Sequence, residues 1–113
     1  IIAYYPERGE ILIDAGALAL SKDQGPTHLG QALSYGRVCT LDLEDYSQLS
    51  LVSLSQEHGK LRAEASFDFQ NIHIGDRLRI LPNHSCLVTA LYDRLQVMSS
   101  GQVIEQWSPI RGW

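Results

Sequence analysis

The chain has 113 residues, 44% of them apolar and 19% charged, and a formal net charge of −4 at pH 7. This length suits one domain with a modest core and excludes a barrel of eight strand–helix units, which needs roughly 200 residues or more. The acidic balance and the lack of an apolar run near the roughly 18 residues of a membrane span lead us to expect no nucleic-acid or membrane partner.

Apolar residues recur mostly with period two, in short runs separated by turn residues, which is typical of strands. A first hairpin is predicted from strands over 1–5 and 11–13, joined by a turn at 6–10. Residues 17–20 fit either a strand or a helical turn. The segment 21–36 is rich in glycine and has no sustained period, which predicts a long loop.

A second hairpin is predicted from strands over 49–54 and 60–65 around a turn at 56–59. Residues 77–81 alternate between charged and apolar side chains, which indicates a further strand. A third hairpin follows over 95–107, with its turn at 99–101. These elements predict one mainly all-β domain over 1–113, either a small β-barrel or a sandwich of hairpins with one long loop.

The stretch 81–86 reads Leu-Pro-Asn-His-Ser-Cys and contains the most informative pair of side chains. In an extended segment His84 and Cys86 point to the same side, with Cα atoms roughly 6.6 Å apart, so they can converge on one ion. Imidazole and thiolate together favour zinc, and two ligands leave positions for water, a substrate oxygen or a third ligand. On spacing alone the commoner arrangement is a buried cysteine and a histidine bonded to a backbone carbonyl.

The remaining candidates are weaker. His58 lies beside Glu57 in the second predicted turn, where a solvated surface position is the simplest interpretation. His28 and His73 show no pattern beyond that of surface residues. The two cysteines, Cys39 and Cys86, are too few for a disulfide framework, so we expect a reducing, cytoplasmic setting.

Several segments together resemble a known family. Residues 75–86, the later Leu-Tyr-Asp at 91–93 and the ending 107–113 are similar to the C-terminal domain of the D-threonine aldolase and D-serine dehydratase-like enzymes. Further similarities are Asp-Ala-Gly at 14–16 and Glu-His-Gly at 57–59, so the resemblance covers the chain from about Arg8 to its end. Its most specific part is Pro-Asn-His-Ser-Cys at 82–86.

The resemblance implies an alanine racemase-like architecture. Such enzymes have an N-terminal barrel that carries pyridoxal phosphate on a Schiff-base lysine, followed by a C-terminal β-domain. This chain opens at Ile1 in the middle of a strand pattern, and neither of its two lysines, Lys22 and Lys60, lies in a recognisable cofactor motif. We therefore expect a C-terminal fragment, inactive by itself, with the pyridoxal phosphate bound in the missing N-terminal domain.

The resemblance also implies a role for the histidine–cysteine pair. His84 and Cys86 would bind a divalent metal beside the cofactor, with zinc favoured over manganese because the thiolate is soft. The metal would act as a Lewis acid on the β-hydroxyl of a D-amino acid substrate, in a D-serine dehydratase or a D-threonine aldolase. Asn83 is expected to orient the His84 loop and His58 to lie at the pocket rim, and the full-length protein is expected to form a homodimer.

A second hypothesis comes from a different functional class. The chain could be a non-catalytic β-barrel module that binds a partner or mediates dimerisation, with His84 and Cys86 as ordinary packed residues. The exposure of these two side chains distinguishes the two hypotheses.

Overall fold

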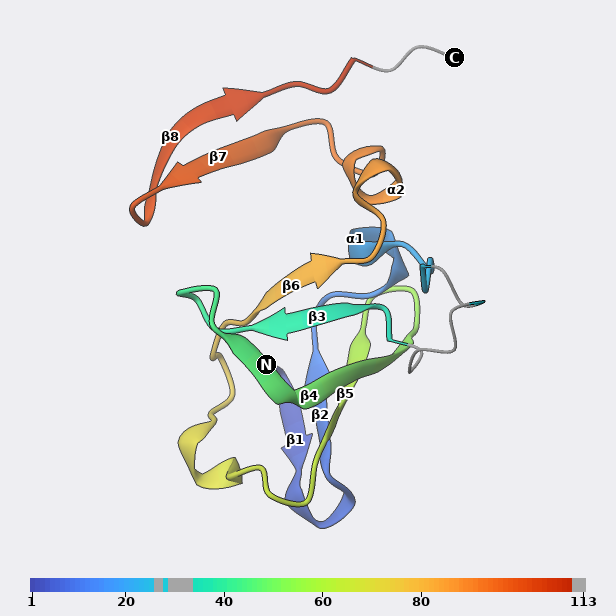
Figure 1. Cartoon of the computed structure of the whole chain (residues 1–113), viewed down its shortest axis with the longest axis vertical. Helices are drawn as coiled ribbons and strands as arrows, with labels where there is room; N and C mark the ends of the chain where they lie inside the picture. The colour runs from blue at the N-terminus through green and yellow to red at the C-terminus, as the bar shows by residue number, and fades with distance from the viewer. Residues whose placement is uncertain (26–27, 29–33, 111–113) are drawn as a thin grey trace.

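The computed structural model describes residues 1–25, 28 and 34–110 (Figure 1). Parts of the predicted loop 21–36 and the end of the 107–113 motif therefore lie outside the described residues. The strands are β1 (Ala3–Tyr5), β2 (Glu10–Ile13), β3 (Gly36–Cys39), β4 (Asp45–Leu54), β5 (Gly59–Ala63), β6 (Arg79–Pro82), β7 (Leu95–Ser99) and β8 (Gln102–Trp107). The helices are α1 (Ala17–Leu20) and α2 (Ser85–Thr89), with 3-10 turns η1 (Pro6–Arg8) and η3 (Phe69–Asn71).

The central strands β2, β5 and β4 build the core. Ile11 of β2 pairs with Leu61 of β5, which pairs in turn with Leu51 of β4. All three side chains are fully buried, and Val38 of β3 joins them. Burying an aliphatic side chain of this size stabilises a fold by about 1.5–3 kcal/mol, so this row of residues holds the three strands together.

A bulge in β4 explains an irregular spacing in the sequence. The pairing of β4 with β5 shifts register between Leu51 and Ser53. The extra residue changes the spacing of inward positions from two to three, so Leu54 is buried along with Leu49 and Leu51. The strand thus keeps its apolar side on the core across the bulge.

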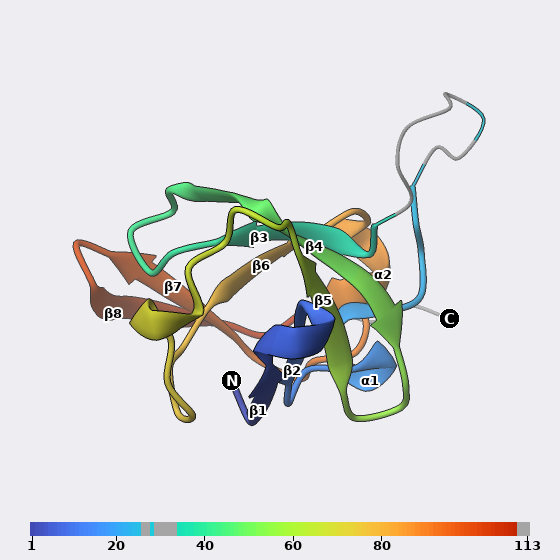
Figure 2. The same ribbon diagram turned by 90° about the horizontal axis from the view of Figure 1, so that it is seen from below.

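The larger sheet has six antiparallel strands in the order β1-β2-β5-β4-β3-β6. The mainly-β prediction is therefore confirmed, but the sheet is open and does not close into the expected barrel (Figure 2). The two edge strands are short, three residues in β1 and four in β6. Moreover, β6 ends at Pro82, which has no backbone N–H for a further ladder bond.

The third predicted hairpin forms the separate two-stranded sheet of β7 and β8. Its two turn residues, Ser100 and Gly101, both have positive φ, as tight hairpin turns require. Neither strand contains a buried residue, and Figure 1 shows the hairpin beyond α2, away from the six-stranded sheet. Among the described residues, no helix is long and apolar enough to cross a membrane.

Candidate metal centre

The histidine–cysteine pair lies where β6 gives way to α2. His84 is the residue that precedes α2 and has extended backbone angles, φ −133° and ψ 97°. Cys86, in contrast, lies in the first turn of the helix, where the Val88 N–H donates to the His84 carbonyl at 3.3 Å. The prediction of an extended segment through both residues was therefore wrong, because the chain turns into a helix after His84.

His84 is hydrogen-bonded to a residue that the sequence did not single out. Its Nδ1 lies 2.6 Å from Oδ2 of Asp23, which is 61 positions earlier in the chain. The other carboxylate oxygen of Asp23 accepts the Gly25 N–H at 2.6 Å. The hydrogen bond from His84, followed by that from Gly25, holds the pKa of Asp23 below its ordinary value, against a smaller opposing effect of desolvation.

Asn83 ties the same segment to the other end of the predicted loop. Its side-chain amide donates to the Ser34 carbonyl at 2.6 Å. Residues before and after the segment 26–33 thus hold Asn83 and His84 from two directions. A further bond, from the Tyr92 hydroxyl to the Ala19 carbonyl at 3.0 Å, links the chain after α2 to α1.

Both candidate ligands are accessible. The side chain of His84 is 42% exposed and bonds to a carboxylate, and Cys86 is exposed as a free thiol. Cys39 is also free, but it is buried in β3, so the two cysteines form no disulfide. Within this chain neither His84 nor Cys86 is buried, whereas the alternative hypothesis expects both side chains to be packed.

The chemistry of these donors fits a metal ion. An imidazole nitrogen and a thiolate sulfur are the ligands that zinc prefers, and a borderline ion accepts both. Within the described part of the chain, no group of three or more His, Cys, Asp and Glu side chains is arranged to hold a metal. A site with only two protein ligands would leave coordination positions of an ion open.

His58 lies at the tip between β4 and β5, as predicted, and is exposed. The tip packs against Gly16: a Cβ at that position would lie 2.5 Å from the Gln56 carbonyl oxygen and the His58 backbone nitrogen. The Ala17 and Leu18 N–H groups at the start of α1 donate to the carbonyls of residues 55 and 56. Figure 1 shows this tip, α1 and α2 at the same end of the six-stranded sheet, although no hydrogen bond joins His58 to His84.

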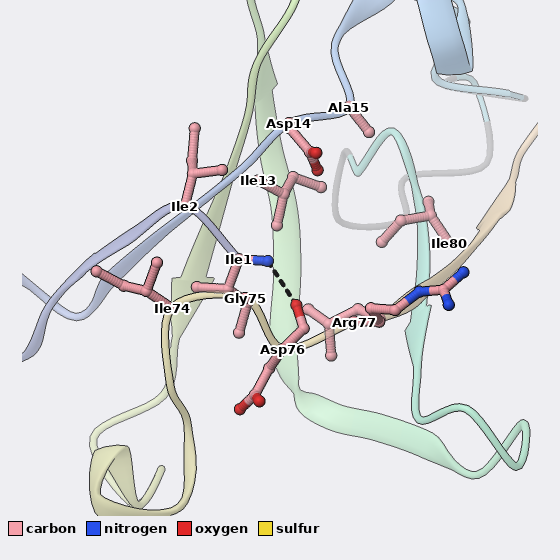
Figure 3. A pocket seen from close by; sticks show the side chains of 11 residues that line it. Ile1, Ile2, Ile13, Asp14, Ala15, Ile74, Gly75, Asp76, Arg77 and Ile80 are labelled. Carbon is pink, nitrogen blue, oxygen red and sulfur yellow. Dashed lines mark hydrogen bonds between the residues drawn. The ribbon is translucent and has the colours of Figure 1, made fainter.

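A separate cavity of about 400 Å³ opens beside β2 and the segment 74–80 (Figure 3). Five isoleucines line it, together with the charged residues Asp14, Asp76 and Arg77. The Ile1 amino group donates to the Asp76 carbonyl across it at 2.6 Å. Neither His84 nor Cys86 lines this cavity, so it is distinct from the candidate metal centre.

Comparison with known proteins places the chain in a family. A family model described as "Putative serine dehydratase domain" matches residues 1–98. The chain belongs to this serine dehydratase domain family. Two curated relatives align with the whole chain: a D-serine dehydratase of Dictyostelium discoideum at 38% identity, and a D-threo-3-hydroxyaspartate dehydratase of Delftia sp. (strain HT23) at 32%.

Solved structures with the same fold also match the chain. An alanine racemase-like protein from Idiomarina loihiensis matches the whole chain with a TM-score of 0.89 and 34% identity, over 30% of its own length. The dehydratase from Delftia sp. HT23 matches with a TM-score of 0.86 and 34% identity, over 31% of its length. The mainly-β fold thus corresponds to 30% and 31% of the lengths of these two longer chains.

Two further structures are variants of a D-threo-3-hydroxyaspartate dehydratase. One replaces a cysteine by alanine and is in the metal-free form, and the other replaces a histidine by alanine. The two substituted positions lie two residues apart in that protein. The present chain spans 29% and 31% of the lengths of the two curated dehydratases.

Proposed function

We propose that this chain is the metal-binding C-terminal β-domain of a pyridoxal-phosphate-dependent dehydratase acting on β-hydroxy D-amino acids. The observation that carries the proposal is the pair of accessible ligands, His84 and Cys86, at the end of β6. Their spacing equals that of the histidine and cysteine substituted in the D-threo-3-hydroxyaspartate dehydratase variants. The dehydratase relatives favour loss of water over the aldol cleavage that the resemblance also allowed.

The residues of this chain have defined tasks in the proposal. His84 and Cys86 hold a divalent ion, zinc in preference to manganese, because a thiolate suits the softer metal. Asn83 fixes the backbone before His84 through its bond to Ser34. His58, at the neighbouring tip, lies at the rim of the substrate pocket.

Pyridoxal phosphate and a divalent ion would supply the chemistry of bond cleavage. When bound, pyridoxal phosphate supplies an electron sink for bond cleavage at Cα, and the divalent ion supplies a Lewis acid for the β-hydroxyl. Overall, D-serine would lose water, and the dehydrated product would then be hydrolysed to pyruvate and ammonia. The cofactor and its lysine would reside in an N-terminal domain outside this chain.

Substitution of the two ligands in the full-length protein tests the proposal. We expect His84→Ala and Cys86→Ala each to remove bound metal and to lower the turnover of D-serine or D-threo-3-hydroxyaspartate by roughly a hundredfold or more, since even the partners of metal ligands are worth 10–100-fold. Elemental analysis measures the metal, and a keto-acid assay measures elimination, with glycine and aldehyde as the products of aldol cleavage.

His73→Ala is the matched control, because His73 is an exposed histidine on the segment before β6. It should keep both metal and turnover. If His84→Ala keeps its full metal content and activity, the assigned ligands are wrong.

A second candidate function is a binding or dimerisation module, and the hairpin β7–β8 favours it. Val103, Ile104 and Trp107 of β8 are all more than half exposed, as in a contact surface. A purely non-catalytic module would lose no activity in the two ligand variants. The expected homodimer stays a prediction.

A further inference from the structure

Asp23 is the one acidic side chain that the described structure places against the candidate ligand His84. Its Oδ2 lies 2.6 Å from His84 Nδ1, and its Oδ1 accepts the Gly25 N–H at 2.6 Å. Gly25 has φ +72°, a conformation that glycine adopts without strain, and this bend turns its N–H back toward the carboxylate. Asp23 is therefore itself fixed before it meets His84, and its side chain is only 29% exposed.

The hydrogen bond decides which ring nitrogen of His84 can bind a metal. An ionised carboxylate can only accept, so Nδ1 must carry the proton that is shared with Asp23. In the neutral imidazole the free lone pair then lies on Nε2. Carboxylates that bind the remote N–H of a metal-binding histidine fix its tautomer and ring orientation and raise its basicity.

From this geometry we infer that Asp23 is a positioning residue for metal binding, holding His84 in the tautomer and orientation that present Nε2 to the ion. The inference rests on the proposed metal site and adds a third residue to it. Asp23 acts through His84 and touches neither the ion nor the substrate. It lies on a part of the chain that contributes no candidate ligand.

Cobalt(II) titration of the full chain tests the inference without any assay of activity. Cobalt bound to a thiolate has characteristic absorption bands, so the titration reports both affinity and ligation by Cys86. We expect Asp23→Asn to weaken cobalt binding 10–100-fold, because the amide NH₂ can donate to Nδ1 and stabilise the wrong tautomer. Asp42→Asn, an exposed aspartate in the turn after β3, should bind cobalt as the unchanged chain does.

A nitrogen NMR spectrum of the metal-free chain provides a second readout, which does not depend on metal binding. Long-range proton–nitrogen correlations of the His84 ring should show the proton on Nδ1 in the unchanged protein. In Asp23→Asn the proton should shift toward Nε2. A His84 ring that carries its proton on Nε2 in the unchanged protein would overturn the inference.

The outcomes separate this inference from the proposed function. If the unchanged chain shows no thiolate–cobalt bands, or keeps them in His84→Ala and Cys86→Ala, both the metal site and the role of Asp23 are wrong. If these two variants abolish the bands but Asp23→Asn binds cobalt as tightly as the unchanged chain, the metal site stands and Asp23 has no positioning role.

Discussion

Glu10, at the start of β2, carries its carboxylate between two cations. Lys60 on the neighbouring strand β5 lies 3.2 Å away, and Arg8 of η1 contacts the other oxygen. The hydrogen bond from Lys60 is the main cause that holds the pKa of Glu10 below its ordinary value, with Arg8 adding to it. The side chain of Glu10 is only 12% exposed, so this pairing joins the first hairpin to β5.

The lowered pKa of Glu10 gives a pH dependence with a definite sign. A depressed carboxyl pKa stabilises the fold above the ordinary pKa of the group, and that stabilisation is lost as the pH falls through the lowered value. We expect Glu10→Gln to lower the melting temperature at pH 7, and the gap to close as the pH falls through the lowered pKa of the native carboxyl. Thermal unfolding followed by circular dichroism, from pH 7 down to the acid limit at which the chain still folds, measures the gap.

Glu105→Gln on the exposed strand β8 is the control, and its melting temperature should follow that of the unchanged chain across the range. A Glu10→Gln gap that stays constant with pH would show that the ion pairs of Glu10 contribute nothing to stability.

The sequence could indicate His84 and Cys86 as metal ligands because both lie in one short motif and both residue types bind metals. It could not indicate Asp23, because Asp23 and His84 are 61 positions apart and only the packing of α1 beside α2 brings them together. The sole local signal was Asp-x-Gly at 23–25, a pattern common in ordinary turns. Side-chain partners across a fold depend on tertiary structure, which residue types alone do not specify.

Two segments that resemble the family, 14–16 and the tip at 56–59, pack against each other at one junction. Asp-Ala-Gly at 14–16 packs against the tip at 56–59, and each glycine leaves room for the other segment. A Cβ on Gly59 would lie 2.7 Å from the Ala15 carbonyl oxygen, and one on Gly16 would clash with three backbone atoms of Gln56 and His58. The junction therefore sets the position of α1, whose following residues include Asp23.

Gly16→Ala should destabilise the fold by about 2 kcal/mol or more, because the new methyl group meets rigid backbone instead of a movable side chain. Urea unfolding measures the change in the free energy of unfolding. Gly101→Ala is the control: a Cβ there meets nothing within 4 Å, so only the backbone strain of its φ of +77° should count, about 1 kcal/mol. Equal losses in the two variants would contradict the clash.

The three hairpins were predictable because each combines alternating apolar residues with a turn rich in glycine or proline. The helix α2 was not, since Ser-Cys-Leu-Val-Thr has no amphipathic period over so few residues. Strand β3 was also missed. Its start, Gly36, was assigned to the loop, whereas its φ of +152° and the 2.7 Å between a built Cβ and the Leu81 carbonyl oxygen reflect close strand pairing with β6.

At the scale of the whole molecule, the hairpin β7–β8 and the six-stranded sheet differ in how well they are buried. The sheet holds Ile11, Leu51 and Leu61 with no exposed surface, whereas every residue of β8 is exposed. An isolated two-stranded hairpin is marginally stable in water. The hairpin should therefore open without unfolding of the rest.

Native-state hydrogen exchange of the 113-residue chain tests this difference. We expect the backbone amides that pair β7 with β8 to exchange at least about tenfold faster than those that pair β2 with β5, because local opening exposes little apolar surface. Equal protection of the two sheets would show that they unfold as one unit.

The proline that ends β6 also bears on how separate molecules meet. An open sheet has two free edges, and an edge strand with unpaired backbone groups is a template for strands of other chains. With Pro82 in place, only three of the four residues of β6 carry an N–H, and the chain then leaves the sheet toward α2. Pro82, which ends β6 just before His84, thus also leaves fewer free N–H groups at this edge for a strand of another molecule to pair with.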